Sequence, residues 1–550
     1  MRGAIKRLRC SVRLGYCATE AHNWARGGTS ARLGGSEARA LACGSSCGGF
    51  ESRPRRPQSD GGLLRRRRRD PQVVQINPQS SAGAYQMPVV ARLSRSHAKL
   101  LNLGQCISRY KRSRELTSTP TTSHSNGLLI SESTLLAHTP PRLRGAGGVP
   151  PESLRTGETW RTRRKLMTPA FHVRVLDNYM RVFNESADLL VKHMCSAADE
   201  TPDEPIRLFK SMQKCAMDII GEVTMEAKFQ LQENKNISFM NAFNRVMFLV
   251  SVRAFRPWLW IQNLYDNTLE GKSYEADVQE MITLSNSIMH KQKDKLQSTK
   301  MFPKPGSEDD ELNIKRETIL MNILLRRHMQ DSSYTLDDVR NDNDTIVSAG
   351  TDTITTCMCF TLHYLGLYPE AQAKAHQELD EIFGDDTDCE ITATHIRQMK
   401  YIECCLKESL RLYPSFPVIG RVLDEDVTIG QGHVIPKGVM CFISIYSLHR
   451  NPKYFKDPEE FIPERFLSEE IKTRHPFSYI PFSGGSKNCL GQKFAMLEMK
   501  LLLAKILLKC KIVSAEPLDR LNVAYEVIVK DKRGNRVWVR RRTEVDSAER

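Results

Sequence analysis

One cysteine stands in surroundings that suit a thiolate. Cys489 lies in the glycine-rich segment Pro481–Ala495, two residues after Lys487, and an apolar stretch from about Gln492 onward predicts a helix. The positive end of a helix and a nearby cation both lower the pKa of a thiol, so we expect a lowered pKa for Cys489. Such a thiolate could act as a nucleophile, a metal ligand or the axial ligand of a haem iron. The alternative without chemistry is a buried structural cysteine in a turn.

A second unusual stretch lies within a long helix that the sequence predicts over about Leu336–Leu367. Thr335 suits the N-cap, and acidic residues follow it in the first turn. The centre of this helix, Ala349-Gly-Thr-Asp-Thr353, carries small residues and a carboxylate where apolar side chains would pack best. A helix that gives up stability at its centre is a candidate site. The simpler interpretation is that the threonine hydroxyls bond to the preceding turn.

Aromatic residues stand in two of the predicted helical regions. Trp160 and Arg164 lie four residues apart in a basic helix expected to run to about residue 172, and they could form a surface cation–π pair. Phe255, Trp258 and Trp260 cluster near the end of another helix. Contact with the core or with a membrane would suit this cluster, and we expect the core.

The rest of the body predicts helices with a few short strands. Apolar positions recur at three and four residues through 173–300, and a further helix is expected over about 396–412. Alternating runs broken by glycine and proline at 425–446, and runs at 513–539, predict strands. The expected fold class is therefore mainly α with small β-sheets (α+β).

The net charge of +16 is concentrated in the first part of the chain. Residues 1–150 hold 25 Lys and Arg against 7 Asp and Glu, whereas residues 151–550 hold 55 against 57. A neutral body argues against a nucleic-acid-binding domain. Residues 1–125 are rich in Arg, Ser and Gly, include the run Arg65–Arg69 and show no period, so we expect disorder there. This tail could bind RNA or acidic membranes, and its composition also resembles a mitochondrial transit peptide.

The 15 cysteines show no repeated spacing. Several, such as Cys357 and Cys404, lie in apolar helical patterns, which predicts reduced core residues in a reducing compartment. Cys43 and Cys47 have a loosely zinc-like spacing, but no second ligand pair follows at the distances of a zinc finger, so we expect no zinc there. No window of 18 apolar residues occurs, and the sequence therefore predicts no transmembrane helix.

Several motifs together favour one role for the cysteine. The pattern Phe482-x-x-Gly485-x-Lys487-x-Cys489-x-Gly491 resembles the haem-binding signature of the haem-thiolate monooxygenases, the cytochromes P450. Further motifs occur in the order of that family, namely Trp160-x-x-x-Arg164, the pentad 349–353, Glu408-x-x-Arg411 and Phe461-x-Pro-Glu-Arg465-Phe466. Phrases such as Trp-Arg-Thr-Arg-Arg-Lys-Leu-Met-Thr-Pro-Ala-Phe-His resemble family 4 in particular, which includes fatty-acid ω-hydroxylases. The likeness covers roughly residues 156–540.

The resemblance implies a cytochrome P450 fold and a haem b site. Cys489 would be the axial ligand of the haem iron, and Asp352 and Thr353 would pass protons on the opposite side of the haem. The buried network implied for Glu408, Arg411 and Arg465 would be structural and lock the cysteine loop. The other implied haem-binding residues are Trp160, Arg164, Gly350, Arg421, Phe482 and Lys487.

The implied reaction inserts one oxygen atom from O2 into a lipophilic substrate, either a fatty acid or related lipid or a xenobiotic. Electrons would come from NADPH through NADPH-cytochrome P450 reductase. Family members face the cytosol from the endoplasmic reticulum membrane, so we expect membrane association there, with mitochondria as the alternative. Nucleic acid is not an expected partner.

The sequence departs from the family pattern in four ways. Ala349 stands where many family 4 members have a glutamate that esterifies the haem, so we expect non-covalent haem. Lys487 replaces an arginine, which weakens the grip on a propionate. The pair Thr353-Ile354 replaces two threonines. The amino-terminal part of the family fold is missing or aberrant, because residues 1–125 have no family counterpart.

We therefore expect three regions. They are a basic segment 1–125, a family fragment with a Pro/Gly-rich insertion over 126–155, and a monooxygenase domain 156–550. Residues 132–155 interrupt one continuous family segment, which suggests a faulty or alternative gene model that sequencing of the transcript would test. Two alternative functions are a haem-binding relative that no longer turns over, and binding of RNA or membranes by the arginine-rich tail.

Overall fold

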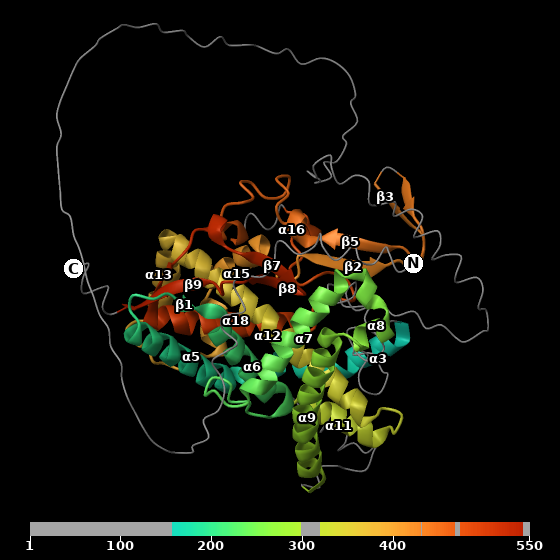
Figure 1. Ribbon diagram of the computed structural model, residues 1–550. Coiled ribbons are helices and arrows are strands. Elements are labelled where there is room, and N and C mark those ends of the chain that lie inside the picture. The colour runs from blue at the N-terminus through green and yellow to red at the C-terminus, as the bar shows by residue number, and fades with distance from the viewer. Residues whose placement is uncertain (1–156, 299–318, 431, 468–473, 543–550) are drawn as a thin grey trace, which may run out of the picture. The chain divides into compact units, whose positions relative to one another are not determined.

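The computed structural model describes residues 157–298, 319–430, 432–467 and 474–542 (Figure 1). These residues fall within one compact unit, Ser118–Arg550. The expected disordered segment, the fragment with its insertion and the pair Cys43 and Cys47 lie outside the described residues.

The described residues are mainly helical, as the sequence predicts. The α-helices are α3 (Gly157–Met167), α4 (Val173–Leu176), α5 (Met180–Glu200), α6 (Leu208–Met225), α7 (Ile237–Ala254), α8 (Gln262–Asp266), α9 (Leu269–Ser298), α11 (Leu320–Gln330), α12 (Leu336–Leu367), α13 (Pro369–Phe383), α14 (Ala393–Gln398), α15 (Tyr401–Leu412), α16 (Ile445–Leu448) and α18 (Gln492–Lys509). Short 3-10 helices are η3 (Thr168–Phe171), η4 (Asp177–Tyr179), η5 (Pro257–Trp260), η6 (Pro463–Phe466), η7 (Pro476–Ser478) and η8 (Leu518–Arg520).

The strands form small antiparallel sheets. One sheet has the order β1 (Ile206–Arg207), β9 (Arg536–Arg541) and β6 (Cys510–Ser514). The other sheets are pairs, namely β2 (Val418–Val422) with β5 (Met440–Ser444), β3 (Val427–Ile429) with β4 (His433–Ile435), and β7 (Val523–Glu526) with β8 (Ile528–Asp531).

Helix α12 has the bounds that the sequence predicts. Thr335 caps it with a capping box, in which the Asp338 N–H donates to the Thr335 hydroxyl and the Thr335 N–H donates to the Asp338 carboxylate. The helix ends before Pro369, which starts α13 because proline has no N–H to continue the ladder. It packs against α6, α15 and α18 and so passes through the core (Figure 1).

Two glycines let other elements approach α12 closely. A Cβ on Gly350 would lie 2.8 Å from Cγ1 of Ile220 on α6. A Cβ on Gly366 would lie 2.5 Å from the backbone nitrogen of Ser514 on β6. Since real side chains do not tolerate such distances, the absence of a side chain at these positions sets the spacing of helix and sheet around α12.

Helix α18 begins three residues after Cys489 and runs into the core. Residues 498–508 are all buried, because α5, α12 and α15 cover it on several sides. Most of these residues are apolar, and the buried ammonium groups of Lys500 and Lys505 form ion pairs with Glu403 and Asp188. The start of α18 therefore joins the cysteine loop directly to the buried core.

Three predicted boundaries were wrong in detail. The helix expected to reach residue 172 stops at Met167 and continues as η3, because Pro169 stands in the next turn. The helix expected over 396–412 is divided into α14 and α15, and Glu378 accepts the N–H groups of Lys400, Tyr401 and Ile402 at the break. The last group of strands begins at Cys510 rather than 513.

Candidate active site

A cavity lies between the centre of α12 and the loop that carries Cys489. Its volume is about 1290 Å³, including the part that opens to solvent. The walls are predominantly apolar, which suits a flat hydrophobic ligand or a lipophilic substrate. The lining residues from α12 and the cysteine loop include Ala349, Gly350, Thr353, Cys357, Phe482, Ser483, Asn488 and Cys489, and further walls come from Arg164, Phe171, Ile220, Phe416, Ile419 and Ile445.

Cys489 is partly accessible and forms part of the cavity wall. Its backbone N–H donates to the Phe482 carbonyl at 3.0 Å, which closes the loop that presents the thiol. The expected lowering of its pKa was wrong. Burial raises the pKa of Cys489, and the Gly491 N–H and the Arg164 charge only partly oppose this effect. Desolvation of the thiolate thus outweighs the hydrogen bond from Gly491 and the charge of Arg164.

Helix α3 contacts the cysteine loop through Arg164 and Trp160. The Arg164 guanidinium donates to the carbonyl and to the side-chain oxygen of Asn488, at 2.9 and 3.1 Å. The Lys487 ammonium lies 5.2 Å from the centre of the Trp160 ring, within the range of a cation–π contact. Trp160 therefore pairs with Lys487 and not with Arg164.

Arg421 lies on β2 and contacts a turn of the cysteine loop that contains a residue with left-handed backbone. It donates to the Ser483 hydroxyl at 2.8 Å and to the Gly420 carbonyl at 2.8 Å. Ser483 has a φ of 63°, in the left-handed region that non-glycine residues rarely occupy. Burial lowers the pKa of the Arg421 guanidinium. A half-buried cation in this position favours binding of an anion.

These residues fit a haem. Among the residues that the structure describes, neither Arg164 nor Arg421 forms an ion pair with a carboxylate. Arg164 lines the cavity, and Arg421 donates to Ser483, which lines it. Two such cations could bind the two propionates of a haem, while the apolar walls would cover its ring. Cys489 would supply the iron ligand, and Phe482 forms part of the same wall.

The α12 pentad faces the cavity only in part. The Thr353 hydroxyl donates to the Ala349 carbonyl at 2.7 Å. This is the hydrogen bond to the preceding turn that the simpler interpretation of the sequence predicts. Both residues line the cavity, and Ala349 offers no carboxylate to it. Gly350 also lines the cavity, although a side chain there would point at Ile220 of α6.

Asp352 is held away from the cavity. Its carboxylate accepts from the Gln213 amide at 2.6 Å and forms an ion pair of 2.7 Å with Lys530 on β8. The side chain is 2% exposed and does not line the cavity. The structure therefore brings Thr353 to the cavity and places the neighbouring carboxylate behind the helix.

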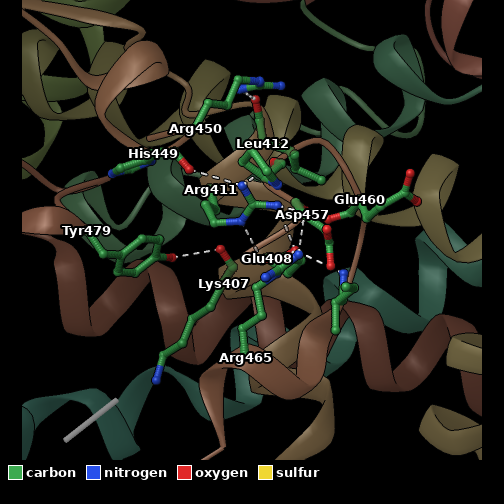
Figure 2. A network of polar contacts seen from close by, with 12 residues as sticks. Lys407, Glu408, Arg411, Leu412, His449, Arg450, Asp457, Glu460, Arg465 and Tyr479 are labelled. Carbon is green, nitrogen blue, oxygen red and sulfur yellow. Dashed lines mark hydrogen bonds and ion pairs between the residues drawn. The ribbon is translucent and has the colours of Figure 1, made fainter. Parts of the chain in front are cut away.

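A buried ionic network joins Glu408, Arg411 and Arg465, as Figure 2 shows. Arg411 donates to both carboxylate oxygens of Glu408 at 2.7 and 2.8 Å, and the Arg465 Nε donates to one of them at 3.2 Å. The Ile462 N–H donates to the same carboxylate at 2.9 Å. The Glu408 and Arg411 side chains are fully buried, so these contacts do not form a surface ion pair.

The network reaches the cysteine loop through a histidine. Arg411 donates to the His449 carbonyl at 3.0 Å, and the His449 Nε2 accepts the Ile480 N–H at 2.8 Å. The Ile480 carbonyl in turn accepts the Ser483 N–H at 2.9 Å. A continuous path of hydrogen bonds therefore connects α15 to the loop that holds Cys489.

Sequence reasoning missed several residues of this site. Asn488 and Ser483 lie within the loop motif, where their polar side chains were a usable signal. Gln213, Lys530 and His449 gave no such signal, because each reaches its partner across a long stretch of chain.

The aromatic cluster expected in the core is exposed. Phe255, Trp258 and Trp260 are 68%, 60% and 38% exposed. The short helix η5 turns only Leu259 inward, and the tryptophans on either side of it point outward. Neighbouring exposed apolar residues are Phe248 on α7, Ile261 just before α8, Leu264 on α8 and Leu269 on α9.

Comparison with known proteins gives a consistent result. The family model described as Cytochrome P450 matches residues 153–535. Cytochrome P450 4c3 of Drosophila melanogaster is 35% identical over 389 residues, which cover 70% of this chain and 72% of that protein. Cytochrome P450 4V2 of Mus musculus is 34% identical over 391 residues, covering 71% and 74%. The crystal structure of the haem domain of cytochrome P450DA has a TM-score of 0.58 at 25% identity and covers 70% of this chain and 78% of that one.

Proposed function

The chain belongs to the cytochrome P450 family, and on that premise we propose that it hydroxylates a fatty acid or a related lipid at the cavity beside Cys489. It is a cytochrome P450 monooxygenase that resembles family 4. Such enzymes use haem and act on lipophilic substrates. The observation that carries the proposal is the apolar cavity, which has a thiol in one wall and the guanidinium of Arg164 in its lining. The guanidinium of Arg421 contacts Ser483 of the same lining, and within the described residues neither arginine has a carboxylate partner.

The haem would be held without a covalent link. Cys489 is the proposed iron ligand, Arg164 and Arg421 the proposed propionate partners, and Phe482 part of the wall against the ring. Lys487 would contribute through Trp160, whose indole it contacts. Ala349 has no group that could form an ester. When bound, haem activates O2 and supplies the oxidising equivalent for the hydroxylation.

Proton supply is assigned to α12. The Thr353 hydroxyl lines the cavity and can exchange its bond to the Ala349 carbonyl for one to a group in the cavity. Asp352 can take part only after its carboxylate leaves Lys530 or Gln213, since both now hold it behind the helix. Gly350 leaves the cavity wall without a side chain at this point.

The proposed electron donor is NADPH, through a cytochrome P450 reductase. Basic residues on α3 and the first turn of α18 are exposed beside the cysteine loop, namely Arg161, Lys165 and Lys493. A basic surface close to the haem ligand favours an acidic redox partner, because opposite charges steer the encounter.

Membrane association is proposed through the exposed apolar residues around Trp258. Two tryptophans and five large apolar residues between 248 and 269 are 38–84% exposed. Tryptophan with such neighbours is typical of a surface that contacts the interface of a bilayer. No described helix has the length and apolar character needed to span a membrane. The proposed location is the cytosolic face of the endoplasmic reticulum, with mitochondria as the alternative.

Haem ligation is tested by absorption spectroscopy. The purified, dithionite-reduced chain is treated with carbon monoxide, with Cys489→Ala as control. A strongly red-shifted Soret band that the variant lacks is expected from a thiolate ligand. Failure to bind haem in the wild-type chain contradicts the assignment of the cavity.

Substrate oxidation is tested on the loaded protein. The chain is combined with NADPH and a cytochrome P450 reductase, and fatty acids of different lengths are screened for hydroxylated products. If the protein binds haem but forms no product and consumes no NADPH, the result would instead support the alternative that this chain is a haem-binding protein without catalytic activity.

A further inference from the structure

Two cysteines meet in the core on the side of the fold that carries the three-stranded sheet. The Sγ atoms of Cys195, near the end of α5, and Cys510, the first residue of β6, lie 3.6 Å apart. Both side chains are buried, at 6% and 0% exposure. A disulfide bond of about 2.05 Å would require these two neighbouring sulfurs to move closer together.

Cys195 also borders a surface hollow. The lining of this hollow comes from the end of α5 and from β6 and β9, and it includes Cys195, Asp199, Val513 and Arg541. The Arg541 guanidinium and the Asp199 carboxylate form an ion pair of 2.7 Å there. A small soluble oxidant can therefore approach Cys195, whereas Cys510 lies deeper, with no exposed surface.

The two sulfurs have different acidities. The hydrogen bond from Cys510 lowers the pKa of Cys195 to about 7, and the positive charges of Arg541 and Lys509 act in the same direction. The same hydrogen bond and burial raise the pKa of Cys510. Cys195 is thus suited to be the attacking thiolate and Cys510 the thiol that follows.

We infer that Cys195 and Cys510 are a redox-active pair that forms a disulfide when the protein meets a peroxide. The Cys195 sulfur attacks one peroxide oxygen, the O–O bond breaks, and one water leaves, which gives a sulfenic acid at Cys195. The Cys510 sulfur then attacks the Cys195 sulfur, the S–O bond breaks, and the second water leaves with the Cys510 proton. Both thiols are oxidised by two electrons in total, and the peroxide is reduced to two waters.

The bond would restrain the helix that carries the cysteine loop. It would join residues 315 positions apart and so connect α5 to the end of α18, because Cys510 directly follows Lys509. Cross-linking such distant residues reduces the freedom of the unfolded chain. The oxidised protein should therefore resist thermal unfolding better than the reduced one.

Peptide mapping tests the pair. The full chain is treated with hydrogen peroxide, free thiols are alkylated in denaturant, and the digest is analysed by mass spectrometry with and without dithiothreitol. The expected product is a peptide that links Cys195 to Cys510 and disappears on reduction. The melting temperature of the oxidised chain should rise by about 2 °C or more.

Two variants test the role of Cys195 as the attacking thiolate and that of Cys510 as the thiol that then forms the disulfide. In Cys510→Ser, a sulfenic acid at Cys195 should become trappable by dimedone, and the rise in melting temperature should vanish. Cys215→Ser is the matched control, since Cys215 is equally buried on α6 but its sulfur bonds to the Ser186 carbonyl. The linked peptide should persist in that variant. Should the wild-type chain yield no linked peptide, or link Cys195 to another cysteine, the inference is wrong, and neither outcome depends on folding of a variant or on monooxygenase activity.

Discussion

The Nε2 atom of His449 accepts the backbone N–H of Ile480 at 2.8 Å, one residue before the segment that leads to Cys489. The ring is fully buried and stacks on Tyr479, with the two centroids 5.0 Å apart. Its backbone carbonyl is held by Arg411 of the ionic network (Figure 2). A neutral imidazole is needed for the bond to Ile480, because a protonated ring cannot accept it.

The first prediction concerns pH. Burial lowers the pKa of His449 from 6.5 to about 3, so between these values the unfolded state binds more protons than the folded state. Stability should therefore rise with pH across this window and be lost as pH falls below about 6.5, by up to about 1.4 kcal/mol per pH unit. Burial of His363, whose pKa falls to about 4, adds to the loss.

Urea unfolding at pH 7.5, 6 and 5 checks this dependence. His449→Gln keeps an acceptor for Ile480 but cannot titrate, so its stability should change less with pH than that of the wild type. His433→Gln, at an exposed residue of β4, is the control and should follow the wild-type profile. Equal pH profiles in all three proteins would refute the role of His449.

Glu408→Gln should destabilise the fold by about 3–5 kcal/mol, because it leaves two buried guanidinium groups without their carboxylate. Thermal or urea unfolding measures the loss, and the haem content of the purified protein should fall with it. Glu158→Gln, which breaks the exposed pair with Arg161, should change stability by less than about 1 kcal/mol. A Glu408 variant as stable as this control would show that the network is dispensable.

Arg421→Met should weaken haem retention. Loss of a charge-assisted bond to a propionate corresponds to roughly a tenfold or greater increase in the rate of haem transfer to apomyoglobin. Arg520→Met removes an exposed arginine of η8 and serves as the control. If the Arg421 variant releases haem at the control rate, this residue does not contact a propionate.

Gly366→Ala should destabilise the protein by about 1–3 kcal/mol, because the new Cβ would lie 2.5 Å from backbone of β6. Gly350→Ala should cost less, since its Cβ meets the flexible end of the Ile220 side chain. Because alanine has a better helix propensity than glycine, about 0.5–1 kcal/mol of the loss in stability is offset in both variants. Chemical unfolding compares them, and the opposite ranking would show that Ile220 cannot move.

Lys530→Met should destabilise the fold by about 3–5 kcal/mol, since it leaves the buried Asp352 carboxylate without its cation. The double variant Lys530→Met with Asp352→Asn should recover most of this loss in a double-mutant cycle.

Asp352→Asn alone tests proton supply. Product formed per NADPH consumed should fall if the carboxylate takes part in catalysis. Unchanged product yield would assign Asp352 a structural role only.

The sequence by itself predicted the mainly helical fold class and the family, and it singled out the cysteine loop as the candidate site. The bounds of α12 could be predicted from the N-cap residue Thr335 and from the helical periodicity of the sequence, because both depend on residues only a few positions apart. The order of the motifs from Trp160 to Gly491 indicated the family, and the comparisons confirmed it.

Only the tertiary structure decided what surrounds those motifs. Lys487 pairs with Trp160, Asp352 with Lys530, and Cys195 with Cys510, each across more than a hundred residues of chain. The pKa of Cys489 differs from expectation for the same reason, since desolvation depends on which elements close over the thiol. Periodicity and capping are local, whereas burial and pairing depend on how distant segments pack.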